Sequence, residues 1–467
     1  MRISGNYFSD TLEMGRALRV KESFDVIERR LTVAERELCF FYIDGFVKDG
    51  EMQRVMQTLL SQKELLSAGR TERTLPYLEV ELCSDFDKIV TAVLSGQTAL
   101  FAETFGPVAI LLDLRTYPAR TTKEPDSDKV MQGAHDGFVE TLVMNTALIR
   151  RRIRDERLTM KHINLGGSSR TDVVICYMDG VADARSVEEI TEKIKSARPK
   201  SLTLGYQSLA ESLIRRGWLN PFPKIRTTER PDTAAAQVLE GNILVLCDTS
   251  PQVMILPTSI FSYLQQTDDY YFPPLTGTYL RIIRTLILIF SVVVTPLWYL
   301  CIEYAETLPP ELKFLVPDEP GYLPIILQLF LSELAIDGLK IASMNTPDML
   351  SNSLSVVGAL LLGDFAVGVG WLCEDVILYM AFVAIANFAQ QNYELGYAFK
   401  FMRMLTLALV YFLGIWGFAL GILVFTIAIS TNNTVFGRLH YLYPLVPFRP
   451  AVMKKILFRT RKKDFEE

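Results

Sequence analysis

The sequence predicts an α/β soluble domain made of two similar subdomains, followed by an α-helical transmembrane domain. Residues 1–280 carry 34 Lys+Arg and 38 Asp+Glu, whereas residues 281–437 carry only 6 and 12. The second part also contains long apolar runs, which are typical of membrane-spanning helices. The first part repeats one apolar pattern at a nearly constant spacing. Arg281 therefore marks the predicted boundary between a soluble part and a membrane part.

The repeat is visible in two pairs of segments. Residues 38–47 (LCFFYIDGFV) and 174–182 (VICYMDGVA) share an apolar run that ends in Tyr-x-Asp-Gly. Residues 93–96 (VLSG) and 238–241 (VLEG) each precede an apolar run and a threonine, and the two pairs are separated by nearly the same length of chain. Each half predicts a strand ending at Asp-Gly, a helix, a glycine turn and two short strands. These glycines suit turn positions that need a positive φ.

A long helix is predicted between the two subdomains. Apolar side chains recur at helical spacing from Phe138 to Ile149, and a basic cluster beginning with Arg150, Arg151 and Arg152 ends the pattern. Positive charge at a helix C-terminus suits the helix dipole and a solvated face. The functional alternative is an intersubunit or gating contact. The predicted parts are an N-terminal segment (1–20), a first subdomain with the linking helix (21–158), a second subdomain (159–280), a helical membrane domain (281–437) and a basic tail (438–467).

Composition disfavours several classes of function. A net charge of −5 argues against a nucleic-acid partner. The six cysteines form no C-x-x-C pair, and the three histidines are dispersed, so we expect neither a disulfide framework nor a metal site. Phosphate-binding, dinucleotide-binding and hydrolase motifs are absent from the sequence, so we expect no catalytic residues, no cofactor and no enzyme. We interpret Asp85/Asp87 and Asp268/Asp269 as surface turns. The N-terminus lacks an apolar region, so we expect no cleaved signal peptide.

Five apolar segments follow the boundary: Thr285–Tyr304, Tyr322–Ile341, Ser353–Cys373, Val376–Ala389 and Met404–Ile429. Their orientation follows from flanking charge. Arg281 and Arg284 precede the first segment, and five acids with one lysine follow it over residues 303–319, which favours a cytosolic soluble domain. The tail, with eight Lys+Arg against three acids, is also expected in the cytosol.

Two cytosolic ends require an even number of crossings, whereas the sequence offers five apolar segments. We therefore expect about four crossings and one segment that is re-entrant or lies at the interface. The candidates are Tyr322–Ile341, which is amphipathic, and Val376–Ala389, which is short.

Carboxylates within these segments are the candidate functional residues. Glu333, Asp337 and Asp364 would each cost about 2.5–3.5 kcal/mol at the centre of a bilayer, so they should face protein, water or the interface. Glu333 and Asp337 are four residues apart and share a helix face, with Lys340 as the expected partner of Asp337. A water-filled ion path and a structural ion pair both remain open at this stage.

The third apolar segment is rich in small residues, including Gly358, which permits close helix packing. Packing of identical helices around an axis would let one face of this segment line a pore. In that hypothesis Asn352, Val356, Val357 and Leu360 form a constriction that gates by dewetting.

Dense stretches of this chain resemble the A-subunit family of bacterial spore germinant receptors. They are residues 124–158, 175–183 (ICYMDGVAD), 226–261 and 308–317 (LPPELKFLVP). Further stretches at 277–284 (GTYLRIIR), 324–337 and 392–398 resemble one branch of the family, whose members amplify ion release rather than sense nutrient. Receptor A subunits tend to carry Glu-Ala-Gly and an arginine where this chain has Asp337-Gly338-Leu339-Lys340, which also favours that branch.

The resemblance implies a multi-pass protein of the spore inner membrane, with its soluble domain and tail facing the spore core. It implies a homo-oligomeric, pentameric cation channel that releases ions during germination, with a small membrane partner in the ion-amplifying branch. One alternative is the A subunit of a nutrient receptor, acting as a signalling scaffold beside a permease-like B subunit and a lipoprotein C subunit. A secondary ion-coupled transporter is a further alternative.

Overall fold

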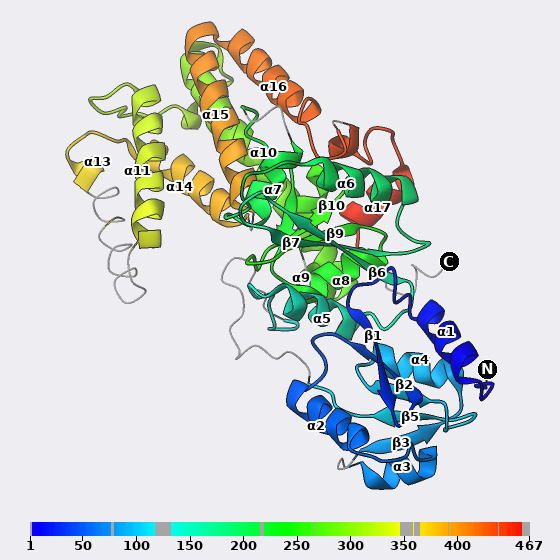
Figure 1. The fold of residues 1–467 in the computed structure, drawn as a ribbon. Coiled ribbons are helices and arrows are strands. Elements are labelled where there is room, and N and C mark those ends of the chain that lie inside the picture. The colour runs from blue at the N-terminus through cyan, green and yellow to red at the C-terminus, as the bar shows by residue number, and fades with distance from the viewer. Residues whose placement is uncertain are drawn as a thin grey trace. The chain divides into compact units, whose positions relative to one another are not determined.

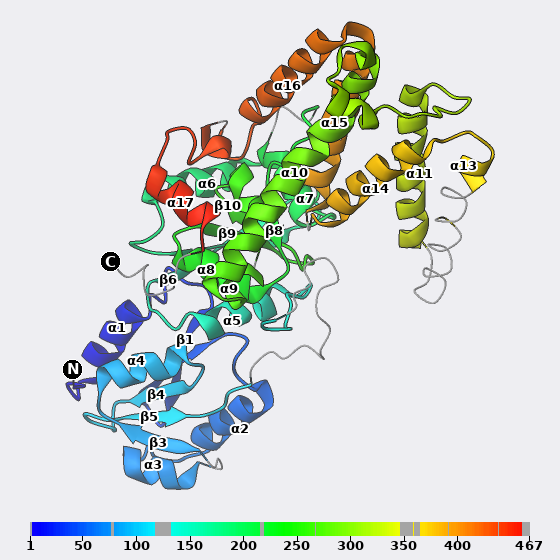
Figure 2. The same cartoon turned by 180° about the vertical axis from the view of Figure 1, so that it is seen from behind.

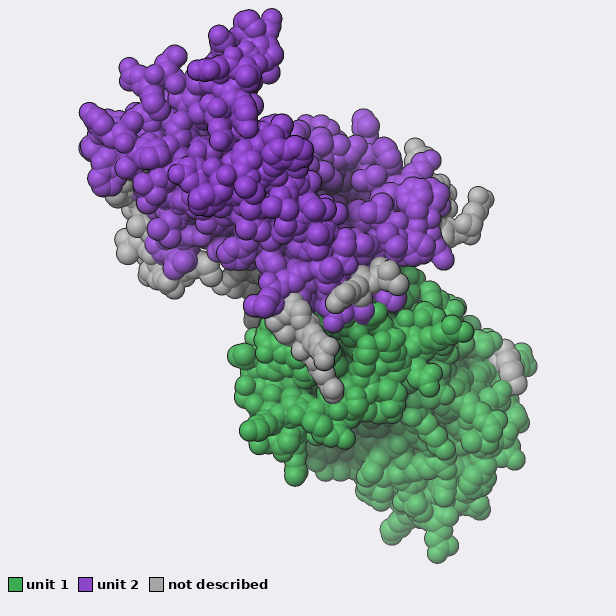
Figure 3. Space-filling model, turned by 90° about the horizontal axis from the view of Figure 1, so that it is seen from above, with its two compact units in different colours: residues 1–215, 225–258, 434–436 green, residues 216–224, 259–433, 437–467 purple. Residues whose placement is uncertain are grey.

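The structure, a computed structural model, divides into two compact units that Figure 3 shows in different colours. It describes residues 2–75, 79–116, 132–214, 219–266, 268–345, 358, 365–390, 392–437 and 439–459. Unit 1 comprises residues 1–215, 225–258 and 434–436, and unit 2 comprises residues 216–224, 259–433 and 437–467. Unit 2 thus begins before Arg281, which lies inside helix α10 (Pro274–Glu303).

Unit 1 contains two five-stranded antiparallel sheets with the same strand order. The first has the order β1-β2-β4-β5-β3 and the second has the order β6-β7-β9-β10-β8. The strands of the first are β1 (Val26–Val33), β2 (Arg36–Ile43), β3 (Val80–Cys83), β4 (Thr98–Ala102) and β5 (Ala109–Leu112). Those of the second are β6 (Leu158–Leu165), β7 (Thr171–Met178), β8 (Arg226–Thr228), β9 (Ile243–Cys247) and β10 (Val253–Leu256). The prediction of two similar subdomains is confirmed.

Helices cover both faces of each sheet (Figure 1). The first repeat contains α1 (Tyr7–Ala17), α2 (Asp49–Leu60), α3 (Ala68–Thr74) and α4 (Phe86–Leu94). The second contains α5 (Leu142–Arg152), α6 (Ala184–Ser196), α7 (Tyr206–Leu213) and α8 (Pro231–Leu239). Along β2, Cys39 and Phe41 join the core beneath α1 and α4, while Leu38 and Phe40 join the core beneath α2 and α3. Burial on both faces explains why the strand is an unbroken apolar run.

Glycine turns connect the repeats' helices to their strands as predicted. Gly96 after α4 and Gly241 after α8 have φ angles of 97° and 92°. A Cβ on Gly96 would lie 2.8 Å from Cδ2 of Phe46. Both the backbone conformation and the close approach therefore require glycine at this position.

Each repeat begins with a helix, which corrects two predicted boundaries. The N–H of Ser4 donates to Asp10 Oδ1 over 2.9 Å, and the N–H of Val139, at the equivalent position of the second repeat, donates to Asn145 Oδ1 over 2.8 Å. Residues 2–20 therefore belong to the first repeat instead of forming a separate segment. Likewise α5 opens the second repeat and does not end the first. The helix expected from Phe138 begins only at Leu142, because the preceding residues form this hydrogen-bonded entry.

A buried arginine joins the two repeats. The Nε of Arg150 donates to Asp25 Oδ2 over 2.9 Å, and its Nη2 donates to Asp25 Oδ1, to Ser23 Oγ and to the carbonyl of Leu158. Ser23 also accepts from the N–H of Met160 over 3.1 Å. Asp25 and Ser23 precede β1, whereas Arg150 lies in α5, so one guanidinium links the entry of the first sheet to the second repeat.

The predicted intersubunit role of the arginine cluster is therefore wrong for Arg150, which is buried within one chain. Arg152 is half-buried and forms an ion pair with Asp136 over 2.6 Å. Arg151 is exposed, and an intersubunit role for it stays a prediction.

The described residues of unit 2 form helices joined by connecting segments (Figures 1 and 2). Its longer helices are α10 (Pro274–Glu303), α11 (Ile325–Asn345), α14 (Glu374–Phe388), α15 (Tyr393–Leu413) and α16 (Ile415–Ser430). The shorter helices are η1 (Ile260–Leu264), α9 (Asp268–Tyr271), η2 (Ala305–Thr307), η3 (Pro310–Leu315), α13 (Ala366–Gly368), η5 (Leu439–Leu442) and α17 (Pro450–Leu457). Within the described residues, α10 and α15 are long and apolar enough to cross a membrane, and α16 is a shorter apolar helix.

The expected single segment Met404–Ile429 is wrong, because the chain turns back at Gly414. This glycine has a φ of 54°, and α16 runs alongside α15 in both views (Figures 1 and 2). A Cβ on Gly414 would lie 2.6 Å from the hydroxyl of Tyr304 at the end of α10. One apolar run thus contains two antiparallel helices. The expectation of one re-entrant or interfacial segment stays a prediction. Most of the third segment, Ser353–Cys373, lies outside the described residues.

The Arg150–Asp25 pair generates a stability prediction. Arg150→Met would leave the buried Asp25 carboxylate without its charged partner, and we expect the free energy of unfolding to fall by about 3–5 kcal/mol. Chemical denaturation followed by circular dichroism measures this loss. Arg154→Met, at a nearby exposed position, should change it by less than about 0.5 kcal/mol. Equal losses in the two variants would contradict a special role for the pair.

Candidate functional site

One cluster of charged side chains in unit 2 lies between α11 and α15. Glu333 of α11 and both Lys400 and Arg403 of α15 are buried, in a unit whose other buried side chains are mainly apolar. Such charges are retained inside apolar surroundings only when they are paired.

Arg403 joins three helices. Its Nε donates to Glu333 Oε1 over 2.8 Å, and its Nη2 donates to the same oxygen. Its Nη1 donates to the carbonyl of Ser291 in α10 over 2.9 Å. The guanidinium therefore fixes α15 against α11 and α10 at one point, through the forked donor geometry that only arginine offers.

Lys400 lies between two carboxylates. Its Nζ is 3.3 Å from Glu333 Oε2, donates to the Glu333 carbonyl over 3.3 Å, and forms an ion pair with Asp337. The Asp337 side chain is 29% exposed, whereas that of Glu333 is only 4% exposed. The charges thus lead from the centre of the helix packing toward its surface.

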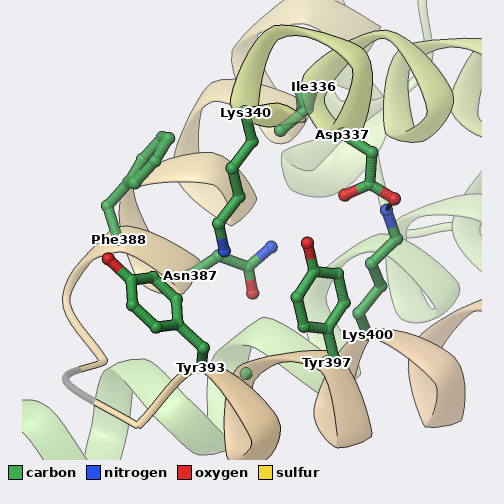
Figure 4. A pocket seen from close by; sticks show the side chains of 9 residues that line it. Ile336, Asp337, Lys340, Asn387, Phe388, Tyr393, Tyr397 and Lys400 are labelled. Carbon is green, nitrogen blue, oxygen red and sulfur yellow. Dashed lines mark hydrogen bonds and ion pairs between the residues drawn. The ribbon is translucent and has the colours of Figure 1, made fainter. Parts of the chain in front are cut away.

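A small pocket continues from Asp337 (Figure 4). Lys340 lies over the rings of Tyr393 and Tyr397, with its Nζ 4.5 and 4.7 Å from their centroids, which is cation–π geometry. The cavity volume of about 20 Å³ suits a water molecule or a small ion. The lining residues are Ile336, Asp337, Lys340, Asn387, Phe388, Tyr393, Gly396, Tyr397 and Lys400.

The structure brings together part of the predicted site. Glu333 and Asp337 share one face of α11, as expected from their spacing. The expected partner of Asp337 is wrong, because Lys400 takes that place while Lys340 lies over the two tyrosines. The predicted ion-path residues Asp364, Asn352, Val356, Val357 and Leu360 lie outside the described residues and stay predictions.

Close packing beside the third segment is visible at one described position. A Cβ on Gly358 would lie 2.4 Å from Cδ2 of Leu339 in α11. A larger residue at this position would require the Leu339 side chain to move.

Sequence reasoning missed Lys400 and Arg403. They are three residues apart and precede an apolar run, so they read as the polar flank of a span. Their spacing puts both basic side chains on one face of α15. Glu333 and Asp337, which are four residues apart, form a face of opposite charge on α11. That complementarity was the available signal.

A second buried cluster lies at the start of α10. Asp269 accepts from Arg281 Nε over 3.1 Å and from Arg284 Nη2 and Nη1 over 3.1 Å each. The guanidinium of Arg281 also lies 4.8 Å from the ring centroid of Tyr270. The prediction of Asp268/Asp269 as a surface turn is therefore wrong for Asp269, which is buried between two cations. Arg281 and Arg284 anchor α10 in addition to flanking an apolar segment.

The chemistry of other side chains is limited. Burial raises the pKa of Cys39, Cys176 and Cys247 to about 12, so these thiols are protonated at neutral pH. Within the described ranges, no group of three or more His, Cys, Asp or Glu side chains is placed to hold a metal ion.

The family model described as Bacillus/Clostridium GerA spore germination protein matches residues 16–467. The chain belongs to the GerA family. Stage V sporulation protein AF of Bacillus subtilis (strain 168) is 37% identical over 463 residues, covering 98% of this chain and 92% of that protein. Spore germination protein KA of the same organism is 27% identical over 453 residues, covering 94% of this chain and 82% of that protein.

One solved structure is also similar to this GerA-family chain. It is the N-terminal domain of the A subunit of the Bacillus megaterium spore germinant receptor GerK3, at 21% identity and a TM-score of 0.42. The match covers 55% of this chain and 96% of that one. The family predicted from the motif stretches is confirmed, and the higher identity to Stage V sporulation protein AF agrees with the predicted branch.

The charge cluster makes a prediction about energetic coupling. Arg403→Gln would leave Glu333 buried with Lys400 alone, and we expect it to cost about 3–5 kcal/mol. The double variant Glu333→Gln/Arg403→Gln should lose less than the sum of the two single losses, by about 0.5–3 kcal/mol, because an amide pair carries no uncompensated charge. Thermal unfolding of the detergent-solubilised chain measures both.

The matched control pair is Glu311→Gln and Lys313→Gln, two exposed charges in η3. Their effects should be small and additive within about 0.5 kcal/mol. Additive losses at Glu333 and Arg403 would show that the two side chains do not act as a pair.

Proposed function

We propose that this GerA-family chain is a subunit of an oligomeric cation channel in the spore inner membrane, which releases ions or amplifies their release during germination. The observation that carries the proposal is the cluster of Glu333, Lys400 and Arg403 between apolar helices. Ionisable groups inside a membrane domain are costly and are retained where they serve an ion path or its gating.

The arrangement of Lys400 supports a role in ion movement. Its ammonium contacts both Glu333 and Asp337, so a small shift toward Glu333 uncovers the Asp337 carboxylate. That carboxylate borders a pocket of ionic size, with Lys340 on the other side. A cation entering the pocket would compete with Lys400 for Asp337. This exchange would move a charge without leaving any carboxylate unpaired.

The proposed topology follows from the same helices. The soluble repeats and the tail lie on the core side, and α10, α15 and α16 are among the crossing helices, with α15 and α16 joined at Gly414. The proposed partners are further copies of the chain and a small membrane protein, without a cofactor, enzymatic activity or nucleic acid.

An A-subunit role in a nutrient receptor is the second candidate. Spore germination protein KA is 27% identical over 94% of this chain, so the same framework occurs in a protein named for germination. In that role the buried cluster would hold a signalling scaffold together beside permease-like and lipoprotein subunits, without conducting ions itself. The transporter alternative requires saturable flux without single-channel steps.

Purified protein in planar lipid bilayers tests the proposal. We expect discrete cation currents, and we expect Asp337→Asn to lower the unitary conductance several-fold because the exposed carboxylate at the pocket is lost. This variant retains the Glu333–Lys400–Arg403 contacts, so it should remain folded. Glu333→Gln should change gating as well, because it releases both cations.

Glu311→Gln is the control, since it removes an exposed acid from η3 outside the cluster. Bilayers that stay silent with folded protein, alone and with the candidate partners, would overturn the channel. If Asp337→Asn and Glu311→Gln change the currents equally, this cluster does not take part in conduction.

A further inference from the structure

The junction between the two repeats of unit 1 uses two faces. The first lies on the first repeat, at the turn after β2, and consists of Gly45, Phe46 and Leu94; we call it the turn face. Phe46 and Leu94 are 0% and 3% exposed. The second face lies on α5 and consists of Val143 and Ala147; we call it the helix face. A Cβ on Gly45 would lie 3.0 Å from Val143 Cγ1 and 3.3 Å from Ala147 Cβ, so the two faces are in contact.

Because the repeats are equivalent, the second repeat has a turn face of its own. Gly180 and Val181 follow the second Tyr-x-Asp as Gly45 and Phe46 follow the first, and Leu239 stands in VLEG where Leu94 stands in VLSG. Here the face is open: Val181 is 45% exposed and Leu239 is 55% exposed. A Cβ on Gly180 would meet nothing within 4 Å. A cluster of exposed apolar side chains at a position that its equivalent buries indicates a site for a partner.

The first repeat, in turn, has an unused helix face on α1. Phe8 and Leu12 occupy the positions of α1 that Val143 and Ala147 occupy in α5, and they are 60% and 55% exposed. Other positions of α1 and α5 match in burial: Tyr7, Asp10 and Met14 are buried like Leu142, Asn145 and Ile149. The two helices are therefore placed alike on their sheets, and only the outer face differs in being covered or open.

The chain thus presents one open helix face and one open turn face, and the equivalents of these two faces already fit each other. We propose that Phe8 and Leu12 on α1 of one copy pack on Val181 and Leu239 of a second copy, head to tail. Such a contact joins different surfaces of identical chains, so it generates a ring when the rotation closes. The inference concerns the soluble unit and does not depend on ion conduction.

Charge supports the pairing and sets its strength. Arg16 is exposed one turn after Leu12, and Asp183 is exposed two residues after Val181, so the two open faces carry opposite charges at their rims. Gly15 occupies the position of Arg150, so the contact between copies lacks the buried ion pair of the internal junction. The contact is therefore weaker than the internal one, and it forms best where copies are concentrated.

Crosslinking of engineered cysteines tests the contact in the full-length chain. One copy carries Leu12→Cys, a second copy with a different tag carries Val181→Cys, and both are co-expressed and treated with a short bis-maleimide. We expect a product that contains both tags, at least about ten times more abundant than with Leu60→Cys replacing Leu12→Cys. Leu60 is 52% exposed on α2, so it matches Leu12 in residue type and accessibility.

A chain carrying both Leu12→Cys and Val181→Cys, expressed alone at low level, separates the alternatives. Crosslinks only within this one chain would overturn the proposal, because they would show that the two open faces close on each other. Equal yields from Leu12→Cys and Leu60→Cys would overturn it as well. In chains without the engineered cysteines, Leu12→Glu should reduce the yield of amine-crosslinked oligomers several-fold, and Leu60→Glu should not. Loss of channel currents with unchanged crosslinking would contradict the proposed function alone.

Discussion

The requirement that every buried charge be neutralised inside the chain determines which segments of this protein must meet. Four of its largest fully buried side chains are arginines, and one of them, Arg230, pairs with the nearby Asp232. The other three are Arg150, Arg281 and Arg403. Each is held by a carboxylate from another segment, namely Asp25, Asp269 and Glu333. Hydrophobic burial is not directional, so it does not select one packing of apolar helices or sheets. A buried guanidinium does, because its partner must arrive at a defined place and angle.

The internal repeat shows how the same fold yields two surfaces with different uses. The two sheets share strand order, entry hydrogen bonds and glycine turns, yet only one of the two helix faces and one of the two turn faces is covered. The two helices also differ at one position that is buried in α5. Where α5 carries Arg150, which pairs with Asp25, α1 carries Gly15. The duplication thus leaves one open helix face and one open turn face. The equivalents of these two faces are in contact within the chain.

Turns and helix faces were predictable from the sequence, because their local residue patterns have a single structural explanation. Asp-Gly and Gly turns at a nearly constant spacing indicated the repeat, and the positive φ of Gly96 and Gly241 follows from the need to turn between helix and strand. The faces of Glu333 and Asp337 on α11 also followed from helix periodicity. The partner of Asp337 did not follow from the sequence. Helix periodicity does not show whether an acid pairs with Lys340 on its own helix or with Lys400 on another helix. Only the packing of α15 on α11 distinguishes them.

By itself the sequence determined the charge division near Arg281, the duplication and the family, because these rest on composition, spacing and motif strings. Tertiary structure alone decided that α5 opens the second repeat, that Met404–Ile429 turns back at Gly414, and that Asp269 is buried between two arginines. The physical reason is common to all three. An apolar run, a basic cluster or an acidic pair has the same appearance whether it faces solvent or another segment. Its partner is supplied by residues distant in the chain.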